Sequence, residues 1–323
     1  MFFIKKNRKF LISLYKIIII LFCSVAVIYI KNKIKNDKEI KICICTLGKK
    51  ENKYLRQFVE HYKNLEVDKI FLYDNNELNG EKFQEVIQDY VDSGFVEIID
   101  WRGLKRQQLF IMNNCYLKNN RNYDWLIFYD IDEFIYLKDF SSLKTYLNDH
   151  RFRYCKKVQL NWNMHTDNQL LYYDNRPLSV RFPERENKNR GKIKGAISTI
   201  KSMIRGGINN LTIDCIHRLS YNLKACNGFG KEMKFLSIYT DKCDYEYYFI
   251  DHYYCKSTEE FIDKINKDDA IRGQNIDNKL SRIKAYFEIN KVTLEKVELI
   301  ENRTGFNLSK YKRNLLKLFN LLI

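Results

Sequence analysis

The chain has 323 residues, of which 45% are hydrophobic and 15% aromatic, so it can bury one large core or two moderate ones. That composition excludes a largely disordered chain. The 56 Lys and Arg outnumber the 40 Asp and Glu and give a net charge of +16, which favours anionic partners such as nucleotides, phosphates or a lipid surface. No basic stretch carries a recognition signature for nucleic acid, so nucleic acid is not an expected partner.

The segment 10–30, FLISLYKIIIILFCSVAVIYI, has the length and apolar character of a helix that spans a bilayer. It is longer than the core of a cleaved signal peptide, and no small-x-small site follows it. We therefore expect a short tail at 1–9, a transmembrane anchor at 10–30 and a linker at 31–39. The expected location is a single-pass membrane protein, facing the Golgi or ER lumen in a eukaryote and otherwise at the cell membrane. Lys and Arg lie on both sides of the span, and the nine-residue tail favours the arrangement in which the large domain is across the membrane.

From Lys41 onward, short apolar runs alternate with segments of helical periodicity. Strands are predicted at 41–47, 69–76, 95–100 and 124–132, and helices at 53–65, 81–91 and 107–117. This alternation indicates βαβ units, which build a mostly parallel sheet covered by helices on both faces. In such sheets ligands bind beyond the carboxyl ends of the strands.

Acidic residues follow the fourth predicted strand, in the stretch IFYDIDEFIYL. Asp130, Asp132 and Glu133 lie there among aliphatic and aromatic residues, and Asp74 ends the second strand. Carboxylates are costly to bury unless they are paired or bind a cation. Two carboxylates one residue apart can hold Mg²⁺ or Mn²⁺ while a diphosphate supplies further oxygens. The alternative is that Asp130 and Asp132 cap a helix or mark a turn.

The later part of the chain contains a second candidate group. Ser257 and Glu260 have capping-box spacing, so a helix is predicted to start there, just after His252. His252 is placed to contact a metal or phosphate, and so is His217, although either can be a packing residue. A C-terminal helical extension is expected at 274–323.

Nine cysteines are present, and Cys23 lies within the expected anchor. The other eight are compatible with disulfides in an oxidising lumen, but their connectivity cannot be read. Cys43 and Cys45 are expected to behave as small hydrophobic residues on a buried strand rather than as zinc ligands. Glycosylation sequons occur at Asn210, Asn302 and Asn307.

Several of these motifs together resemble glycosyltransferase family 92 and related family-2-like enzymes, over about Ile40 to Gly273. They are ENKYLRQFVEHY, IFLYDNN, the triplet Arg106-Gln107-Gln108, Cys115, DWLIFYDIDEFI, KSMIRGGI, IHRL and DHYYCKSTEEFIDK. The resemblance implies an α/β domain of GT-A (nucleotide-diphospho-sugar transferase) fold at 40–273. It also implies transfer of a sugar from a UDP-sugar to a glycan acceptor, and it favours galactose as that sugar.

The resemblance also implies roles for individual residues. Asp130, Asp132 and His252 would hold a divalent metal, Mn²⁺ or Mg²⁺, against the donor diphosphate. The residues that would border the nucleotide or approach the donor are Thr46, Glu51, Asp74, Arg106 and Gln107. The chain departs from the family at Val180, where an acid is expected, and Glu184 lies close by. Glu184 is therefore the first candidate for the general base, with Asp214, Asp244 and Asp251 as further candidates.

Aromatic side chains at Trp162, Tyr172 and Tyr173 lie among Asn and Asp and suit a carbohydrate acceptor, or else belong to the core.

Two other functions are compatible with the sequence. A D-x-D phosphatase or phosphotransferase also places its motif after an apolar strand, but the haloacid-dehalogenase pattern has Thr or Val where this chain has Phe134. A non-enzymatic membrane module would bind anionic partners through net charge alone, and its affinity would collapse with salt.

Overall fold

The structure is a computed structural model, and it describes residues 19–20, 22, 24, 39–186, 198–233, 239–240, 244–267 and 276–320. Two units are distinguished, Met1–Ile40 and Lys41–Ile323, and the fold below is that of the second. Its elements in chain order are β1 (Ile42–Gly48), α2 (Asn52–Asn64), β2 (Lys69–Asp74), α3 (Gln84–Asp92), β3 (Val96–Asp100), α4 (Gln108–Asn119), β4 (Trp125–Ile127), β5 (Glu133–Leu137), α5 (Leu143–Leu147), η1 (His150–Phe152), β6 (Lys157–Met164), α6 (Leu178–Arg181), β7 (Ser198–Arg205), β8 (Cys226–Asn227), β9 (Tyr239–Thr240), β10 (Tyr248–His252), α7 (Thr258–Asn266), α8 (Ile276–Ile289), α9 (Leu294–Thr304) and α10 (Ser309–Asn320).

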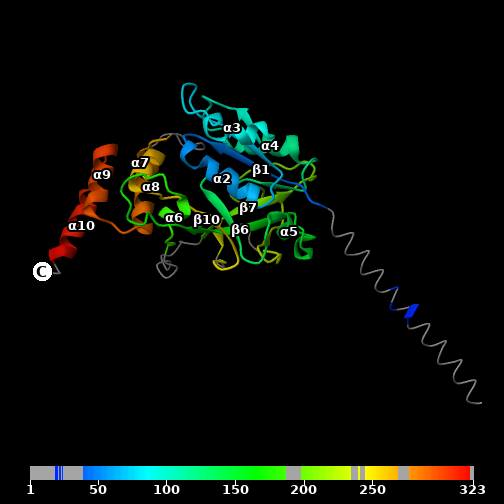
Figure 1. Ribbon diagram of the computed structural model, residues 1–323. Helices are drawn as coiled ribbons and strands as arrows, with labels where there is room; N and C mark the ends of the chain where they lie inside the picture. Colours follow the sequence, from blue (N-terminus) through cyan, green and yellow to red (C-terminus); the bar gives the residue numbers. More distant parts are fainter. Residues whose placement is uncertain are drawn as a thin grey trace, which may run out of the picture. The chain divides into compact units, whose positions relative to one another are not determined.

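The described strands form one mixed sheet in the order β3-β2-β1-β4-β7-β6-β10-β5, with β8 added to β6 and β9 added to β7 (Figure 1). The pairs β3-β2, β2-β1 and β1-β4 are parallel, as the alternation of strands and helices predicts. Beyond β4 the sheet differs from the mostly parallel prediction, because β7 runs antiparallel to both β4 and β6. The fold is therefore an α/β sheet with a parallel half and a mixed half.

The fourth strand is shorter than predicted. It ends at Ile127 instead of Asp132, and the chain turns at Asp130 to begin β5 at Glu133. Two hydrogen bonds close this turn: the Glu133 amide donates to the Asp130 carbonyl at 3.0 Å, and the Asp130 amide donates to Glu133 Oε2 at 3.1 Å. The D-x-D pair thus lies in a turn at the carboxyl edge of the sheet.

Helix α4 packs on β1, and a disulfide joins them. Alternate residues of a strand face the same side, and Cys43 and Cys45 of β1 belong to one buried cluster with Ile111 and Cys115 of α4. Cys45 and Cys115 are bonded to each other, so the expectation that Cys45 acts as a free hydrophobic residue is wrong, whereas Cys43 is free and buried. The expectation failed because the 70-residue separation gives no local signal of the pairing.

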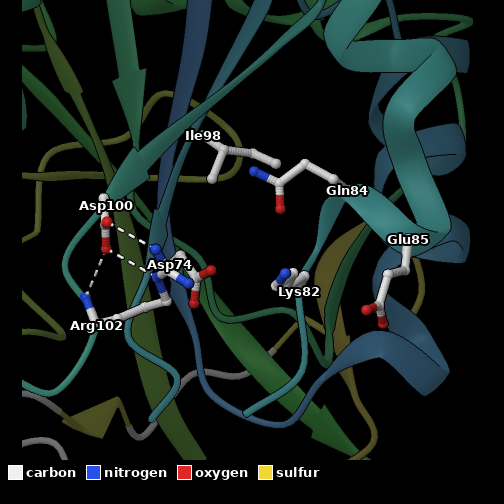
Figure 2. A pocket seen from close by; sticks show the side chains of 7 residues that line it. All are labelled: Asp74, Lys82, Gln84, Glu85, Ile98, Asp100 and Arg102. Atoms are coloured by element: carbon white, nitrogen blue, oxygen red, sulfur yellow. Dashed lines mark hydrogen bonds and ion pairs between the residues drawn. The ribbon is translucent and has the colours of Figure 1, made fainter. Parts of the chain in front are cut away.

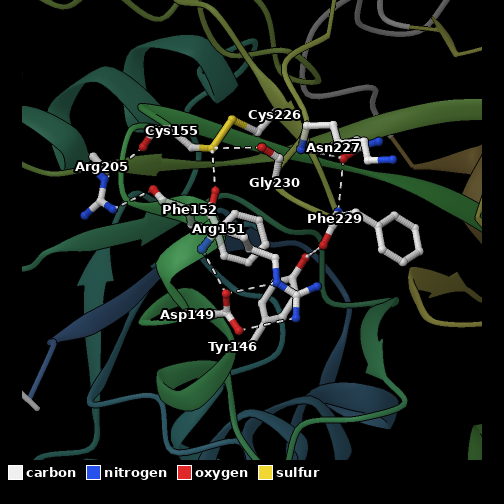
Figure 3. Close-up of a disulfide and its surroundings, with 12 residues drawn as sticks. Tyr146, Asp149, Arg151, Phe152, Cys155, Arg205, Cys226, Asn227, Phe229 and Gly230 are labelled. Carbon is white, nitrogen blue, oxygen red and sulfur yellow. Dashed lines mark hydrogen bonds and ion pairs between the residues drawn. A yellow bond between two sulfur atoms is a disulfide. The ribbon is translucent and has the colours of Figure 1, made fainter. Parts of the chain in front are cut away.

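A second disulfide, Cys155–Cys226, ties the chain before β6 to β8 (Figure 3). Cys155 lies directly after η1, whose Phe152 carbonyl accepts a hydrogen bond from Arg205 of β7 at 2.9 Å. The bridge therefore fastens β6, β7 and β8 at the end of the sheet away from the D-x-D turn.

The C-terminal helices pack on one another. Helices α7, α8 and α9 lie at one end of the sheet (Figure 1). They share a buried cluster that includes Phe261, Ile283, Tyr286 and Ile300. The predicted helical extension is present over the described residues, but its predicted start at 274 lies outside them.

The predicted anchor at 10–30, the tail before it and nearly all of the linker after it lie outside the described residues, apart from Ile19, Ile20, Phe22 and Ser24. Of the helices that can be described, none is long and apolar enough to cross a membrane.

Candidate active site

The carboxyl ends of β1, β2 and β4 meet at the D-x-D turn. Gly48, the last residue of β1, lies directly against this turn, because a Cβ built there would stand 2.6 Å from Ile131 Cδ1 and 2.7 Å from Phe83 Cζ. Only a glycine leaves room for Ile131 at this distance. The central residue of the D-x-D motif is thus packed onto the end of the first strand.

The segment Asp74-Asn75-Asn76 joins the loops that follow β1, β2 and β3. The side-chain oxygen of Asn76 accepts a hydrogen bond from the Lys50 backbone amide at 2.7 Å. The backbone amide of Asn76 donates to Asp74 Oδ1 at 2.9 Å. Asn75 Nδ2 donates to the Leu104 carbonyl at 2.7 Å. These bonds hold three neighbouring loops in one arrangement at the sheet edge.

Asp130 lies beside a buried lysine. Lys201 of β7 places its Nζ 2.8 Å from Asp130 Oδ2 and 3.3 Å from Glu133 Oε1, and Gln108 Nε2 of α4 is 3.5 Å from Asp130 Oδ1. Burial would raise the pKa of Asp130, but the Lys201 ammonium outweighs it and lowers that pKa. Burial raises the pKa of Glu133 well above its usual range. Asp130 is therefore held as a carboxylate that still exposes 38% of its side chain.

Asp132 has different partners on its two oxygens. Lys264 Nζ lies 2.7 Å and Lys256 Nζ 3.1 Å from Oδ2, while His252 Nε2 lies 3.5 Å from Oδ1. Burial opposes ionisation here, but the two ammonium groups lower the pKa of Asp132 well below its usual range. Asp132 is accordingly an ionised carboxylate in a largely buried position.

Two histidines and a tryptophan form a wall next to these acids. The ring of Trp162 on β6 is 4.2 Å from the ring of His252 and 5.3 Å from that of His217. Burial lowers the pKa of both histidines, that of His217 to about 4. Within the described part of the chain, Nδ1 of each is buried without a hydrogen-bond partner. The wall thus presents neutral imidazoles and an aromatic face.

A cavity of about 370 Å³ opens at the ends of β2 and β3 (Figure 2). Its lining residues are Asp74, Lys82, Gln84, Glu85, Ile98, Asp100 and Arg102. Arg102 is bonded to Asp100 at 2.9 Å, and the remaining charged lining residues are Asp74, Lys82 and Glu85. Burial raises the pKa of Asp74. This volume and mixed lining suit a small polar ligand with one flat apolar part.

The other residues predicted to border the nucleotide lie around the same edge. Thr46 on β1 is buried, and among the described residues its Oγ1 has no hydrogen-bond partner. Glu51, at the start of α2, is bonded to Lys267 at 2.8 Å. Arg106 lies exposed on the loop before α4 with a φ of 57°, and Gln107 donates to the Lys105 carbonyl. Gln108, rather than Gln107, reaches Asp130.

The four candidates for the general base lie in different surroundings. Asp244 accepts hydrogen bonds from the amides of the next residues, Asp251 is paired with His165 and Arg185, and Asp214 contacts Arg218 and the Tyr221 amide. These three serve structural contacts. Glu184 is exposed, on a segment that pairs with Thr166 next to the end of β6.

Three lysines of the site, Lys201, Lys256 and Lys264, were not predicted. Lys201 stands in the otherwise ordinary strand STIKSMIR, and its buried side chain is a weak signal, since lysine is rarely buried without a charged partner. Lys256 and Lys264 flank the predicted capping box, but only the pairing of β10 with β5 and β6 brings α7 to Asp132. Both lysines contact Asp132, which lies 124 residues before Lys256 and 132 residues before Lys264 in the sequence.

The fold and this edge together define an α/β protein whose polar groups gather at the carboxyl ends of parallel strands, where ligands bind in this class. The sequence model of glycosyltransferase family 92 matches residues 38–287. The chain belongs to glycosyltransferase family 92.

Relatives in that family match a shorter stretch. A family 92 protein of Ricinus communis is 28% identical over 105 residues, which cover 32% of this chain and 18% of the relative. A relative from Oryza sativa subsp. japonica is 28% identical over 120 residues, which cover 37% of this chain and 20% of the relative. A relative from Arabidopsis thaliana is 29% identical over 107 residues, which cover 33% of this chain and 18% of the relative. The matched stretch spans about a fifth of the length of these relatives.

Among solved structures, S. aureus TarS 1–349 in complex with UDP-GlcNAc is similar at a TM-score of 0.35 and 11% identity, over 82% of this chain and 80% of that chain. Likeness at this level establishes neither a shared fold nor a shared ligand.

Proposed function

We propose that this chain is a metal-dependent glycosyltransferase of GT-A fold, which moves a sugar from a nucleotide-diphosphate donor to a glycan acceptor. The observation that carries the proposal is the convergence of Asp74, Asp130, Asp132 and His252 at one edge of the sheet in a family 92 chain. Parallel strands that end in polar residues at one edge are the usual site of nucleotide binding in α/β sheets.

A divalent cation fits the donors at Asp132. Carboxylate oxygen and imidazole nitrogen are ligands that Mn²⁺ accepts, and the 3.5 Å between Asp132 Oδ1 and His252 Nε2 is close to the spacing of two ligands about 2.1 Å from one ion. Among the described residues no group of three or more His, Cys, Asp or Glu side chains is placed to hold a metal ion, so Asp132 and His252 would bind it together with oxygens of the donor. Asp130, which Lys201 holds at 2.8 Å, would have to turn toward the same ion to be a third contributor. The cation would supply charge stabilisation for the departing diphosphate.

The cavity beside Asp74 is proposed to hold the nucleoside. Ile98 offers an apolar contact to a base, and the Asp74 carboxyl and the Lys82 ammonium offer polar contacts. Thr46 has an unbonded buried hydroxyl on the neighbouring strand and could bond the same ligand. Glu51, Arg106 and Gln107 are proposed to border the donor from the adjoining loops.

The acceptor is proposed to lie over the wall formed by Trp162, His217 and His252. An aromatic face next to polar groups suits a sugar ring, and the wall stands beside the proposed cation site. Glu184 is proposed to take the proton of the acceptor hydroxyl, since the segment that carries it pairs with Thr166, and the adjacent His165 amide donates to the His252 carbonyl at 3.1 Å.

The donor is proposed to be UDP-galactose, on the ground of the resemblance of the sequence motifs alone. Membrane attachment through 10–30 and a luminal location are proposed from the apolar sequence of that segment. Two disulfides in the described chain are compatible with an oxidising compartment.

The proposal is tested by incubating the purified chain with a panel of nucleotide-sugars and measuring nucleoside diphosphate release, with Mn²⁺ or with EDTA. We expect release with UDP-galactose that EDTA stops and that Asp132→Asn lowers at least a hundredfold. Asp89→Asn is the matched control, because Asp89 is exposed and pairs with Arg56 on the helices. Release that survives both EDTA and Asp132→Asn would contradict the proposal, and release of inorganic phosphate instead would identify a phosphatase.

A further inference from the structure

A second cavity, of about 250 Å³, is lined in part by Lys256 and Lys264, the two lysines that contact Asp132. Its lining residues are Lys50, Lys53, Tyr54, Glu81, Lys256, Glu260, Asp263, Lys264, Asn266 and Lys267. Half of these are lysines, contributed by the loop after β1, the start of α2 and both ends of α7. The cavity is below the size of a typical site for a whole nucleotide, and fits a small anion.

The charges at its buried end do not balance. Glu260 does not compensate the lysines, because both of its oxygens are bonded to Arg181, at 2.7 and 3.1 Å. Asp132 is shared by Lys256 and Lys264, and Glu51 pairs with Lys267. Three ammonium groups thus face two carboxylates, and the lysine side chains are only 4%, 21% and 14% exposed. The other charges of the lining, Lys50 and Lys53 against Glu81 and Asp263, balance one another. An uncompensated cation in a partly dry site attracts an anion more strongly than one in water.

The cavity adjoins the one proposed for the nucleoside. Glu81 lines the lysine cavity and its neighbour Lys82 lines the other, and Asn76 is bonded to Lys50 on one side and to Asp74 on the other. A ligand with a nucleoside in the first cavity therefore has its anionic end within reach of the second. Asp132 contacts two of the lysines of the second cavity through Oδ2, and its Oδ1 lies 3.5 Å from His252 Nε2.

We propose that Lys256, Lys264 and Lys267 form an anion subsite that takes the diphosphate of the donor. The assignment to a diphosphate rests on the proposed function, whereas the anion subsite itself does not. In the transfer, the bond between the anomeric carbon and the phosphate oxygen breaks, and a bond from that carbon to the acceptor oxygen forms. The acceptor proton passes to the base, and the leaving oxygen gains the negative charge that the ammonium groups stabilise.

The experiment is a calorimetric titration of the full chain in EDTA with inorganic pyrophosphate and, separately, with UDP and uridine. Lys264→Gln is expected to weaken pyrophosphate and UDP binding about tenfold and to leave uridine binding unchanged. Lys264→Arg should restore most of the loss, which separates charge from folding. Lys138→Gln is the control, since Lys138 lies on the surface and pairs with Glu246.

The subsite would be overturned if Lys264→Gln and Lys138→Gln bound pyrophosphate with equal affinity. It would also be overturned if Lys264→Gln weakened uridine binding as much as it weakened pyrophosphate binding. Should Lys264→Gln be unstable, Lys267→Gln provides the same comparison. If the chain binds pyrophosphate through these lysines but releases no nucleotide from any sugar donor, the proposed function fails and the subsite stands. If it turns over a sugar donor and Lys264→Gln binds pyrophosphate normally, only the subsite fails.

Discussion

Buried lysines determine the charge state of the D-x-D pair. Lys201 contacts Asp130, and Lys256 and Lys264 contact Asp132, so each carboxylate is ionised in a place where burial alone would favour the neutral acid. A carboxylate kept ionised in this way is ready to bind a cation without first losing a proton. Strand β7 therefore supplies the cation beside Asp130, and α7 with the residues just before it supplies the cations beside Asp132.

Lys201→Met tests this at the residue scale. It removes the cation beside Asp130, whose carboxylate is 38% exposed, and beside the buried Glu133, so the free energy of unfolding should fall by about 2 kcal/mol. Lys157→Met on the neighbouring strand is the matched control, because Lys157 is equally buried but donates to the Ser220 carbonyl at 2.7 Å rather than to an acid. Lys157→Met should lower the free energy of unfolding by about 1 kcal/mol. Urea denaturation measures both, and equal losses would contradict the account.

The same residues show what the sequence can and cannot reveal. The resemblance to family 92 predicted that Asp130, Asp132 and His252 lie together, whereas the residues by themselves indicated only that the aspartates end an apolar run and that His252 precedes a capped helix. Gln108 and the three lysines were not predicted, because their contacts depend on how β7, β10 and α7 are placed, and nothing local in the sequence fixes that placement.

At the scale of elements, helix α7 connects the site to the C-terminal helices. Its N-terminus is a capping box, in which Ser257 Oγ accepts from the Glu260 amide and Glu260 Oε2 accepts from the Ser257 amide at 3.0 Å. Glu260 also binds Arg181 and Tyr54, so the start of the helix is bonded to α2 and α6. Lys264, one turn further on, is positioned by this start.

Ser257→Ala is expected to lower the free energy of unfolding by about 1 kcal/mol and also to weaken UDP binding, because the first turn orients Lys264. Thr293→Ala is the control, since Thr293 caps α9 in the same way through the Lys296 amide. It should cost similar stability and leave UDP binding unchanged. Thermal denaturation and titration with UDP measure the two effects. Loss of UDP affinity in both variants, or in neither, would argue against a positioning role for α7.

The elements themselves were largely predictable in the parallel half of the sheet. Apolar residues at helical spacing defined α2 and α4, and compact apolar runs defined β1, β2 and β3. The end of β4 was placed five residues too late, since Phe128 to Asp132 continue the apolar run but leave the sheet to form the turn. The pairing of β10 with β6 was not predictable, because it joins His252 to Met164 across 88 residues of sequence.

At the scale of the whole molecule, two disulfides link segments far apart in sequence. Cys45–Cys115 and Cys155–Cys226 close loops of 70 and 71 residues. On a loop-entropy model each contributes about 4 kcal/mol to stability, since each restricts the unfolded chain. The bridges fasten the two halves of the sheet separately, one on β1 and one beside β6.

The double variants Cys45→Ala/Cys115→Ala and Cys155→Ala/Cys226→Ala should therefore each lower the melting temperature by several degrees. The intact chain should lose stability in dithiothreitol, and a variant lacking all four of these cysteines should not respond to the reductant. Differential scanning fluorimetry with and without reductant makes the comparison. A melting temperature that the reductant leaves unchanged in the intact chain would show that the bridges are absent in solution.

The central claim is that Asp132 and His252 bind a cation that holds a nucleoside diphosphate at the carboxyl edge of the sheet. The most direct measurement is a crystal structure of the chain with Mn²⁺ and UDP, with the metal located by its anomalous signal. We predict a manganese peak bonded to Asp132 and His252, uridine beside Asp74, and phosphates directed toward Lys264. A structure in which both D-x-D carboxylates remain bonded only to protein, with the nucleotide elsewhere, would contradict the account.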